Sequence, residues 1–388
     1  MLDKTTLQAQ MLANRLQKRF RHLKKWARAT ARETSLQNAR ETSLQNAQRT
    51  EIGIFRLYDR DIPEIPLILD FYGDLNENSN SDWALSGALY KRPYEKDEAD
   101  EEQWLAVMKE SAACALGISV EHVFIKQRER QRGVSQYERI SEKHFEKIVS
   151  EGGLSFKVNL SDYLDTGLFP DRRLLRAMVR AESKNKKVLN LFSYTGSFSV
   201  YAASGGAVST DSVDLSNTYL NWARDNFSLN GFSARLLPRM DANEDRPRIT
   251  RIKRMDANNE RINSAKAEGH KLIRADVLDF VDKAVAAKMK WDLIVLDPPA
   301  FSNSKRMTEN FDLNRDIFRL LGKCLKLLSP SGKIFLSINV RRSAPSASEI
   351  EEELKQQTNV CVTDITDKII DEDFKGKKMP RGFIISLL

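Results

Sequence analysis

Cysteine and histidine are scarce in this sequence of 388 residues. The three cysteines, Cys114, Cys324 and Cys361, lie far apart and show neither CxxC nor Cys/His spacing. This distribution argues against a disulfide framework and a structural zinc site, and it fits a reducing cytoplasm. The four histidines form no HExxH or similar cluster, so the sequence predicts no metal cofactor.

Long apolar runs are missing as well. No run approaches the length that a bilayer span needs, and the first residues, MLDKTTLQAQ, lack the apolar core of a secretory signal. We therefore expect a cytoplasmic protein with no membrane partner. A composition of 41% hydrophobic and 30% charged residues is typical of a globular protein, and the length suffices for two domains.

Positive charge is concentrated at the N-terminus. Residues 1–30 contain eight Lys and Arg residues against one acidic residue, so they hold most of the net charge of +8. Apolar residues recur between them at three- to five-residue spacing, which predicts an amphipathic helix over 7–27. The recurring residues are Leu7, Met11, Leu16, Phe20, Leu23 and Trp26. Such a basic face either is merely solvated or binds a polyanion, and we predict RNA contacts at Lys24 and Lys25.

The following stretch predicts a linker and a small mixed domain. ARETSLQN (31–38) is repeated identically at 39–46, which is too short for a solenoid and suggests a polar helical or disordered linker. Residues 51–160 predict short strands broken by Pro63 and Pro66 and a helix that ends at Gly117. Residues 122–133 predict a strand and a basic turn. Its Arg128 and Arg130 either bind RNA phosphates or form an ordinary hairpin tip.

From about residue 161 short β-rich runs alternate with helical stretches. The runs lie at 187–192, 207–214, 270–276, 291–297 and 332–339, with helices expected at 217–231 and 315–328. This alternation predicts an α/β fold, a doubly wound, mainly parallel sheet of the Rossmann-like type. We therefore predict three parts: a basic helix and linker (1–50), a small α/β accessory domain (51–160) and a Rossmann-like domain (161–388).

Unusual residues follow the strands of this sheet, where ligands of α/β folds gather. Gly196 lets the backbone approach a ligand, and Asp214 is placed to accept hydrogen bonds from ribose hydroxyls. Asp276 and Asp297 end the next two strands; each could instead be a helix cap or a turn residue. The Gly-rich phosphate fingerprint of nicotinamide-dependent oxidoreductases is absent. A nucleoside without phosphates, such as S-adenosylmethionine, suits this pattern.

The stretch DPPAFSNSKRM (297–307) predicts the second substrate's site. Pro298 and Pro299 stiffen the turn and remove two N–H donors, which leaves Asp297 and carbonyl groups to accept hydrogen bonds. Phe301 can stack on a base. We expect Lys305 and Arg306 to meet phosphate, although SNSKRM can also be a surface loop that precedes a helix.

These residues resemble a known family. DPPAFSNSKRM followed by FDLNRD (311–316), together with RLQKRFRHLKKWAR, FRLYDRDIPE, KQRERQRG, VNLSDYLDTGLF, LNLFSYTGSFSV and the DEDF region, is similar to the RlmK-type 23S rRNA guanine N7-methyltransferases. These often form the C-terminal half of the bifunctional RlmKL protein. The resemblance implies a class I S-adenosylmethionine-dependent fold, 23S ribosomal RNA as substrate, and a guanine-N2-methylating half that is either separate or fused.

The resemblance also implies site residues. Asp297, Pro298, Pro299 and Phe301 would hold the base. The cofactor would lie against Gly196, Asp214, Asp276 and Asp297, with further contacts from Phe169, Arg173, Asn190 and Phe192. FPDRR and SINVRR stand where FLDHR and SNNKR are expected, so Arg172 and Val340 receive no role. Residues 235–268 look like an insertion, which we predict to lie away from the strand carboxyl ends.

Several reactions remain open at this point. Cytosine-5 methylation normally needs a cysteine nucleophile, and none lies in 297–307. Guanine N7 has an in-plane lone pair and no proton to lose, so alignment and exclusion of water suffice there. We predict guanine N7. Cytosine C5 or guanine N2 of ribosomal RNA, or an RNA-binding homologue without catalysis, are the alternatives.

Overall fold

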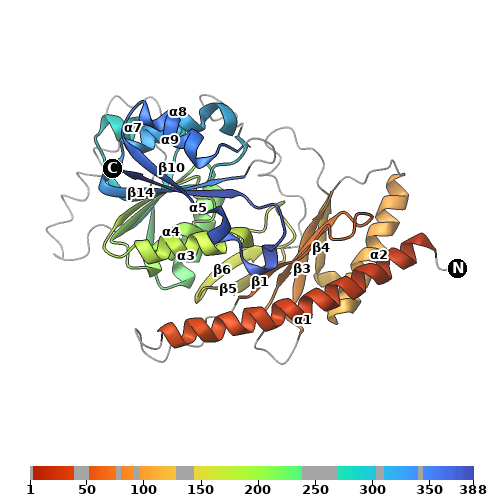
Figure 1. Ribbon diagram of the computed structural model, residues 1–388. Coiled ribbons are helices and arrows are strands. Elements are labelled where there is room, and N and C mark those ends of the chain that lie inside the picture. Colours follow the sequence, from red (N-terminus) through yellow and green to blue (C-terminus); the bar gives the residue numbers. More distant parts are fainter. Residues whose placement is uncertain are drawn as a thin grey trace. The chain divides into compact units, whose positions relative to one another are not determined.

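The computed structural model describes residues 3–38, 52–75, 80–90, 97–127, 144–237, 269–302, 310–339 and 344–388. The chain forms two compact units (Figure 1). The first comprises Met1–Pro170 and Asp371–Lys377, and the second comprises Asp171–Ile370 and Lys378–Leu388. The basic helix therefore belongs to the first unit. None of the helices in the described ranges combines the length and apolar character that a membrane span requires.

The first unit is a four-stranded sheet with two helices and a hairpin. Its sheet has the order β1-β2-β3-β4, with all neighbours antiparallel except β3 and β4. Pro63 and Pro66 lie between β1 and β2, and Gly117 ends α2 in the left-handed conformation at φ 66°, as expected. The elements are α1 (Lys4–Asn38), β1 (Ile54–Asp59), β2 (Leu67–Tyr72), β3 (Ala84–Leu89), α2 (Glu98–Leu116), β4 (Val123–Gln127), β5 (Glu146–Glu151) and β6 (Leu154–Asn159).

Helix α1 packs through a stripe that differs in part from the predicted one. Leu12, Leu16 and Leu23 are fully buried at helical spacing, and they pack with the aromatic side chains of the sheet. Leu7 and Met11 are 50% and 40% exposed, so the prediction was wrong for these two residues. The first ARETSLQN copy (31–38) is helical as the end of α1, whereas the second (39–46) lies outside the described residues.

The second unit contains the predicted α/β sheet. Its strand order is β15-β16-β14-β11-β7-β8-β10-β9, and only β16 runs antiparallel to its neighbours. This confirms the mainly parallel, Rossmann-like fold. The strands are β7 (Lys187–Leu191), β8 (Ser209–Asp214), β9 (Ala234–Leu237), β10 (His270–Arg274), β11 (Trp291–Leu296), β14 (Leu328–Ile338), β15 (Val360–Asp364) and β16 (Arg381–Leu387).

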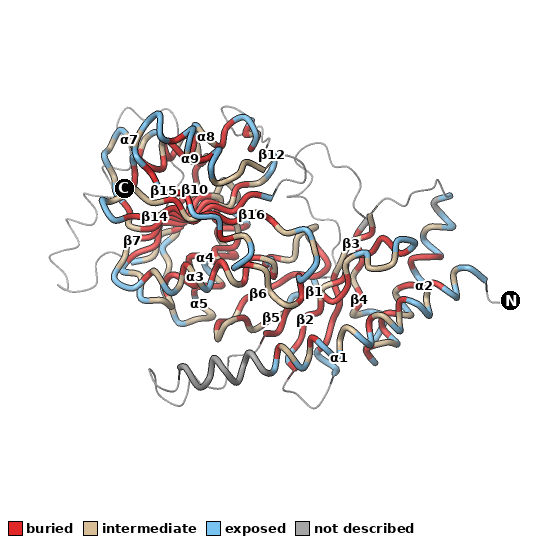
Figure 2. The backbone as a smooth tube through the Cα atoms, viewed as in Figure 1, coloured by how far each residue is buried: buried red, intermediate tan, exposed pale blue. Residues whose placement is uncertain are grey.

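Helices cover both faces of this sheet (Figure 1). Side chains alternate along the central strands, so that Val188 and Leu293 pack on one face and Leu189 and Ile294 on the other. The result is a strand layer that is buried on both sides (Figure 2). The first face packs against α3 (Arg173–Glu182) and α4 (Ser197–Ser204); the second packs against α7 (Val277–Ala286), α8 (Leu313–Leu325) and α9 (Ala347–Lys355).

Strand β9 corrects the expectation about residues 235–268. Ala234–Leu237 form an edge strand parallel to β10, a strand that the sequence reading missed. A parallel strand ends at the same edge as its neighbours, so the chain leaves Leu237 at the carboxyl ends of the strands. The premise that this segment starts on the opposite side was wrong. Residues 238–268 themselves lie outside the described part of the chain.

The segment Asp371–Lys377 belongs to the first unit, although the residues before and after it in the chain belong to the second. Asp373 is fully buried, and its carboxylate accepts a hydrogen bond from the Arg56 backbone N–H at 2.9 Å. Arg19 of α1 donates to the Asp373 carbonyl oxygen at 3.2 Å. Lys377 forms an ion pair with Asp61. A short C-terminal segment is thus built into the N-terminal unit.

This anchoring gives a stability prediction. Replacing Asp373 with Ala leaves the part-buried Arg56 N–H without its acceptor, which should lower the free energy of unfolding of the first unit by about 1 to 3 kcal/mol. Urea unfolding followed by circular dichroism measures the change. Asp367→Ala removes an exposed carboxylate nearby in the chain and should be close to neutral. Equal stability of both variants would contradict the anchoring role.

Candidate cofactor and base site at the strand ends

The central strands end level with one another. Leu191 of β7 pairs in register with Val213 of β8 and with Leu296 of β11. The next residues, Phe192, Asp214 and Asp297, therefore leave the sheet at the same edge. The sequence reading expected its unusual residues to gather here, and the register brings these three strand ends together.

The turn after β7 is strained. Phe192, Tyr194 and Gly196 all have positive φ, at 57°, 50° and 73°. Such conformations are costly for residues other than glycine, and they concentrate at ligand sites. A Cβ on Gly196 would also lie 2.8 Å from the Cβ of Ala223, so this position requires glycine for space as well as conformation. Helix α4 starts at the following residue, Ser197.

Asp214 fastens this turn to β8. Its Oδ2 accepts a hydrogen bond from the Tyr194 N–H at 2.9 Å, and its Oδ1 accepts one from the Ser216 N–H at 2.8 Å. Burial raises the pKa of Asp214 to about 6, although the backbone donors oppose this shift. Each carboxylate oxygen has a second lone pair, so the group can still accept hydrogen bonds from two ribose hydroxyls.

Two other candidates for cofactor contact have partners within the protein. The Asp276 carboxylate caps α7 by accepting hydrogen bonds from the Leu278 and Asp279 N–H groups, and burial raises its pKa. Capping was the alternative left open from the sequence. Asn190 is buried and donates to the Ser199 hydroxyl at 2.9 Å. Cofactor contacts by either residue stay predictions.

The DPPAF turn is tied to the start of α8 by a backbone hydrogen bond. Pro298 is buried, Pro299 is partly buried, and the Ala300 carbonyl accepts a hydrogen bond from Leu313 N–H at 3.1 Å. Phe301 pairs with Asp312 in a two-stranded ladder, and its side chain is 48% exposed. The ladder consists of β12 (Phe301–Ser302) and β13 (Phe311–Asp312). An exposed aromatic side chain on a rigid turn is suited to stacking on a base.

The turn after β7 is in contact with β13, the strand that pairs with the end of the DPPAF turn. The rings of Phe192 and Phe311 have centroids 5.2 Å apart. Phe311 is fully buried and immediately precedes the capping residue of α8. This tilted aromatic contact packs the turn after β7 against β13.

Arg172 is the site residue that sequence reasoning missed. Its guanidinium pairs with the Asp297 carboxylate, and the Nε–Oδ2 distance is 3.1 Å. The neighbouring Arg173, which was predicted for the cofactor, is buried at the start of α3. Phe169 is 40% exposed and belongs to the first unit. Arg172 and Asp297 are 125 positions apart, so no local sequence pattern could have predicted their pairing.

The predicted RNA contacts are only partly within the described residues. Lys25 is exposed on α1, whereas the Lys24 ammonium lies 4.7 Å from the centroid of the Trp83 ring. Lys24 is thus engaged in a cation–π contact within its own unit. Arg128, Arg130, Lys305 and Arg306 lie outside the described part of the chain.

Asp214 yields a prediction for ligand binding. Because its pKa is raised to about 6, its carboxylate takes up a proton as the pH falls below 6 and then loses acceptor capacity. We expect the affinity for S-adenosylhomocysteine to fall between pH 7 and pH 5. Asp214→Asn should weaken binding about 10- to 100-fold at pH 7.5 and remove this pH dependence.

Titration calorimetry across this pH range measures both effects. Asp276→Asn makes the same chemical change at the neighbouring strand end, and Asn also caps helices well, so this variant should keep the pH dependence. A wild-type affinity that stays constant down to pH 5 would refute the role of Asp214.

Comparison with known proteins agrees with this fold. Residues 71–240 match the family model of S-adenosylmethionine-dependent methyltransferases. The crystal structure of the methyltransferase SMU.776 complexed with SAH aligns with this chain with a TM-score of 0.58. The alignment covers 97% of this chain and 82% of that one, at 20% sequence identity. A structure from Streptococcus mutans aligns with a TM-score of 0.57. These likenesses show the fold.

Sequence relatives define the family more narrowly. Ribosomal RNA large subunit methyltransferase K of Neisseria meningitidis is 38% identical over 95% of this chain and 85% of its own length. Ribosomal RNA large subunit methyltransferase K/L of Magnetococcus marinus is 36% identical over 94% of this chain, but the match spans only 41% of that longer protein. The chain therefore belongs to the ribosomal RNA large subunit methyltransferase K family, and its cofactor is S-adenosylmethionine.

Proposed function

We propose that this protein transfers a methyl group to guanine N7 in 23S ribosomal RNA. The names of the K and K/L relatives support ribosomal RNA of the large subunit as the substrate. The observation that carries the proposal is the DPPAF turn: Asp297 is held at the end of the central strand β11, and an exposed Phe301 follows on a rigid turn.

In this proposal, residues at different strand ends have different roles. Bound S-adenosylmethionine supplies an electrophilic methyl group. Asp214 accepts hydrogen bonds from ribose hydroxyls, and Gly196 lets the backbone approach the nucleoside. Phe301 stacks on the base, while Pro298 and Pro299 keep the turn rigid. Since N7 carries its own lone pair, these residues need only align the base and exclude water.

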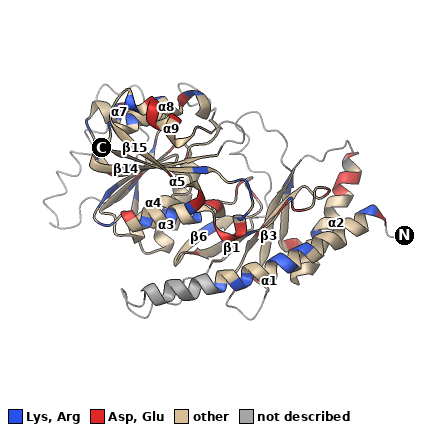
Figure 3. Ribbon diagram, viewed as in Figure 1, with Lys and Arg blue, Asp and Glu red and all other residues tan. Residues whose placement is uncertain are grey.

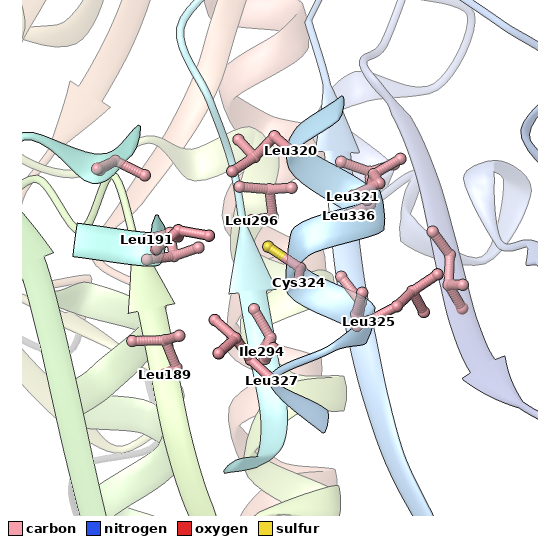
Figure 4. Close-up of a cluster of buried hydrophobic side chains, with 14 of the residues drawn as sticks. Leu189, Leu191, Ile294, Leu296, Leu320, Leu321, Cys324, Leu325, Leu327 and Leu336 are labelled. Carbon is pink, nitrogen blue, oxygen red and sulfur yellow. The ribbon is translucent and has the colours of Figure 1, made fainter. Parts of the chain in front are cut away.

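The positions of the thiols disfavour methylation of cytosine C5. Cys324 points into the apolar layer between α8 and the sheet, among Ile294, Leu296 and Leu320 (Figure 4). Burial raises the pKa of Cys324 to about 12, so it is not a thiolate nucleophile. Cys114 is on α2, and Cys361 is on the edge strand β15, which two other strands separate from β11. No cysteine lies at the DPPAF turn.

Guanine N2 is the closer alternative. An exocyclic amine must lose a proton, and a free carboxylate beside it would be the natural acceptor. Asp297 is instead paired with the buried Arg172, whose guanidinium contacts both carboxylate oxygens, so it is not a free carboxylate. The pairing therefore supports N7 over N2. The resemblance also implied a guanine-N2-methylating half, either separate or fused as in the longer K/L proteins. This half stays a prediction.

Chemical cleavage tests the proposed atom. Unmodified ribosomal RNA is incubated with the protein and labelled S-adenosylmethionine, then reduced with borohydride and treated with aniline, which cuts at N7-methylguanine. We expect incorporation together with a single cut in 23S RNA. Incorporation without cleavage would refute N7, and no incorporation would refute the enzyme.

The outer side of α1 is the proposed RNA surface. Lys18, Arg21 and Lys25 are exposed and recur at three- and four-residue spacing, so they form one stripe along the helix. Basic residues are distributed along α1 in Figure 3. Arg15 and Arg19, by contrast, bind Asp61 and backbone oxygens of the first unit. We propose this stripe for phosphate contacts in place of Lys24.

Charge reversal of the stripe tests this surface. The triple variant Lys18→Glu, Arg21→Glu, Lys25→Glu should weaken RNA binding and reduce the slope of log affinity against log salt by about 2 to 3, roughly one per lost phosphate contact. Fluorescence anisotropy at several salt concentrations measures it. Reversing the exposed residues Lys184, Lys326 and Lys368 changes the net charge equally and should leave the slope nearly unchanged. Equal effects of the two triple variants would show that RNA binding depends on net charge and not on this stripe.

A further inference from the structure

The ion pair between Arg172 and Asp297 has a fixed geometry. Arg172 Nε lies 3.2 Å from Oδ1 and 3.1 Å from Oδ2 of Asp297, and Nη2 lies 3.1 Å from Oδ1. One residue precedes α3 and the other follows β11, both in the second unit. Two nitrogens of a planar guanidinium fix the plane of the carboxylate as well as its position.

Arg172 is itself held from a second side. Its Nη1 donates to Asp171 Oδ2 at 2.7 Å, and its side chain is only 7% exposed. Burial alone would lower the pKa of Arg172, but the charges of Asp171 and Asp297 outweigh burial and raise it. The guanidinium therefore stays protonated at any working pH. Its two carboxylate partners leave the cluster with one net negative charge.

The pairing leaves acceptor capacity on Asp297. Two of the three contacts converge on Oδ1 and only one reaches Oδ2. The carboxylate is also 20% exposed, whereas its partner is almost covered. An ionised carboxylate accepts hydrogen bonds and does not donate them. Asp297 thus presents a single kind of hydrogen-bonding group.

We propose that Arg172 is a positioning residue that keeps the Asp297 carboxylate oriented so that it accepts N–H donors from the Watson–Crick edge of the bound guanine. This inference rests on the proposed function, since it concerns the same base. Guanine offers N1–H and an amino group on that edge, whereas adenine has an acceptor at N1, so an acceptor-only carboxylate favours guanine.

Two substitutions separate charge from geometry. Arg172→Gln keeps N–H donors but loses the charge, and Arg172→Lys keeps the charge but loses the planar fork. With an RNA fragment that contains the methylated guanine, Arg172→Gln should lower kcat/KM about 10- to 100-fold, and Arg172→Lys should recover part of it. The affinity for S-adenosylhomocysteine should change by less than about threefold, because the contacts proposed for Gly196 and Asp214 remain.

A double-mutant cycle with Asp297→Asn gives the decisive result. The double variant Arg172→Gln, Asp297→Asn should be no worse than Asp297→Asn alone. The cycle is measured on kcat/KM and on RNA affinity with S-adenosylhomocysteine bound, which needs no turnover. Preference for the guanine fragment over its adenine counterpart should fall in both single variants. Additive effects, or an unchanged preference, would overturn the proposal.

Arg176 provides a matched control on the same helix. It is buried as well, but its guanidinium lies over the rings of Phe198 and Tyr201, at 5.9 and 5.7 Å from their centroids. Arg176→Gln should lower stability, and its effect should add to that of Asp297→Asn. Methylation of another guanine atom would refute the N7 assignment alone, since the Arg172 cycle would still show coupling.

Discussion

The level register of β7, β8 and β11 is the constraint on which the site depends. Because Leu191 pairs with both Val213 and Leu296, the three strands deliver their next residues to one edge of the sheet. A register shift of one residue would turn each side chain to the opposite face and separate Asp214 from the turn it fastens. The apolar layers on both faces, which alternate along these strands, make such a shift costly.

Polar groups at this edge are fixed before any ligand arrives. Asp214 binds two backbone N–H groups, and Asp297 binds a guanidinium that Asp171 holds from its other side. Buried charges are tolerated only with such partners. The same contacts stabilise a turn with three positive φ values. Preorganisation of this kind reduces the conformational entropy that is lost when a ligand binds and orders the site.

The sequence predicted the strongly periodic elements well. β7, β8, β10 and β11 lie within two residues of their expected bounds, because apolar runs of this length between polar turns are buried strands. β9 was missed since its four residues are mostly half-exposed, and so short a run shows no clear periodicity. The docking of Asp371–Lys377 was also missed, because its partners are more than 300 residues away in the chain.

The sequence predicted which residue types lie at the strand ends, but it did not predict the hydrogen-bond and ion-pair partners of these residues. Asp214, Asp276 and Asp297 all lie at strand ends, yet one fastens a turn, one caps a helix and one pairs with an arginine. Residue type alone does not distinguish these roles, since a carboxylate suits all three. The Arg172–Asp297 pair spans 125 positions, so only the fold brings it together.

Hydrogen exchange tests most directly whether this edge binds the cofactor. Amide exchange is followed by mass spectrometry with and without S-adenosylmethionine. The account predicts slower exchange in residues 192–197, 214–219 and 297–302, with no change in α1. If S-adenosylmethionine binds while these three segments exchange as before, the cofactor lies elsewhere and the account is wrong.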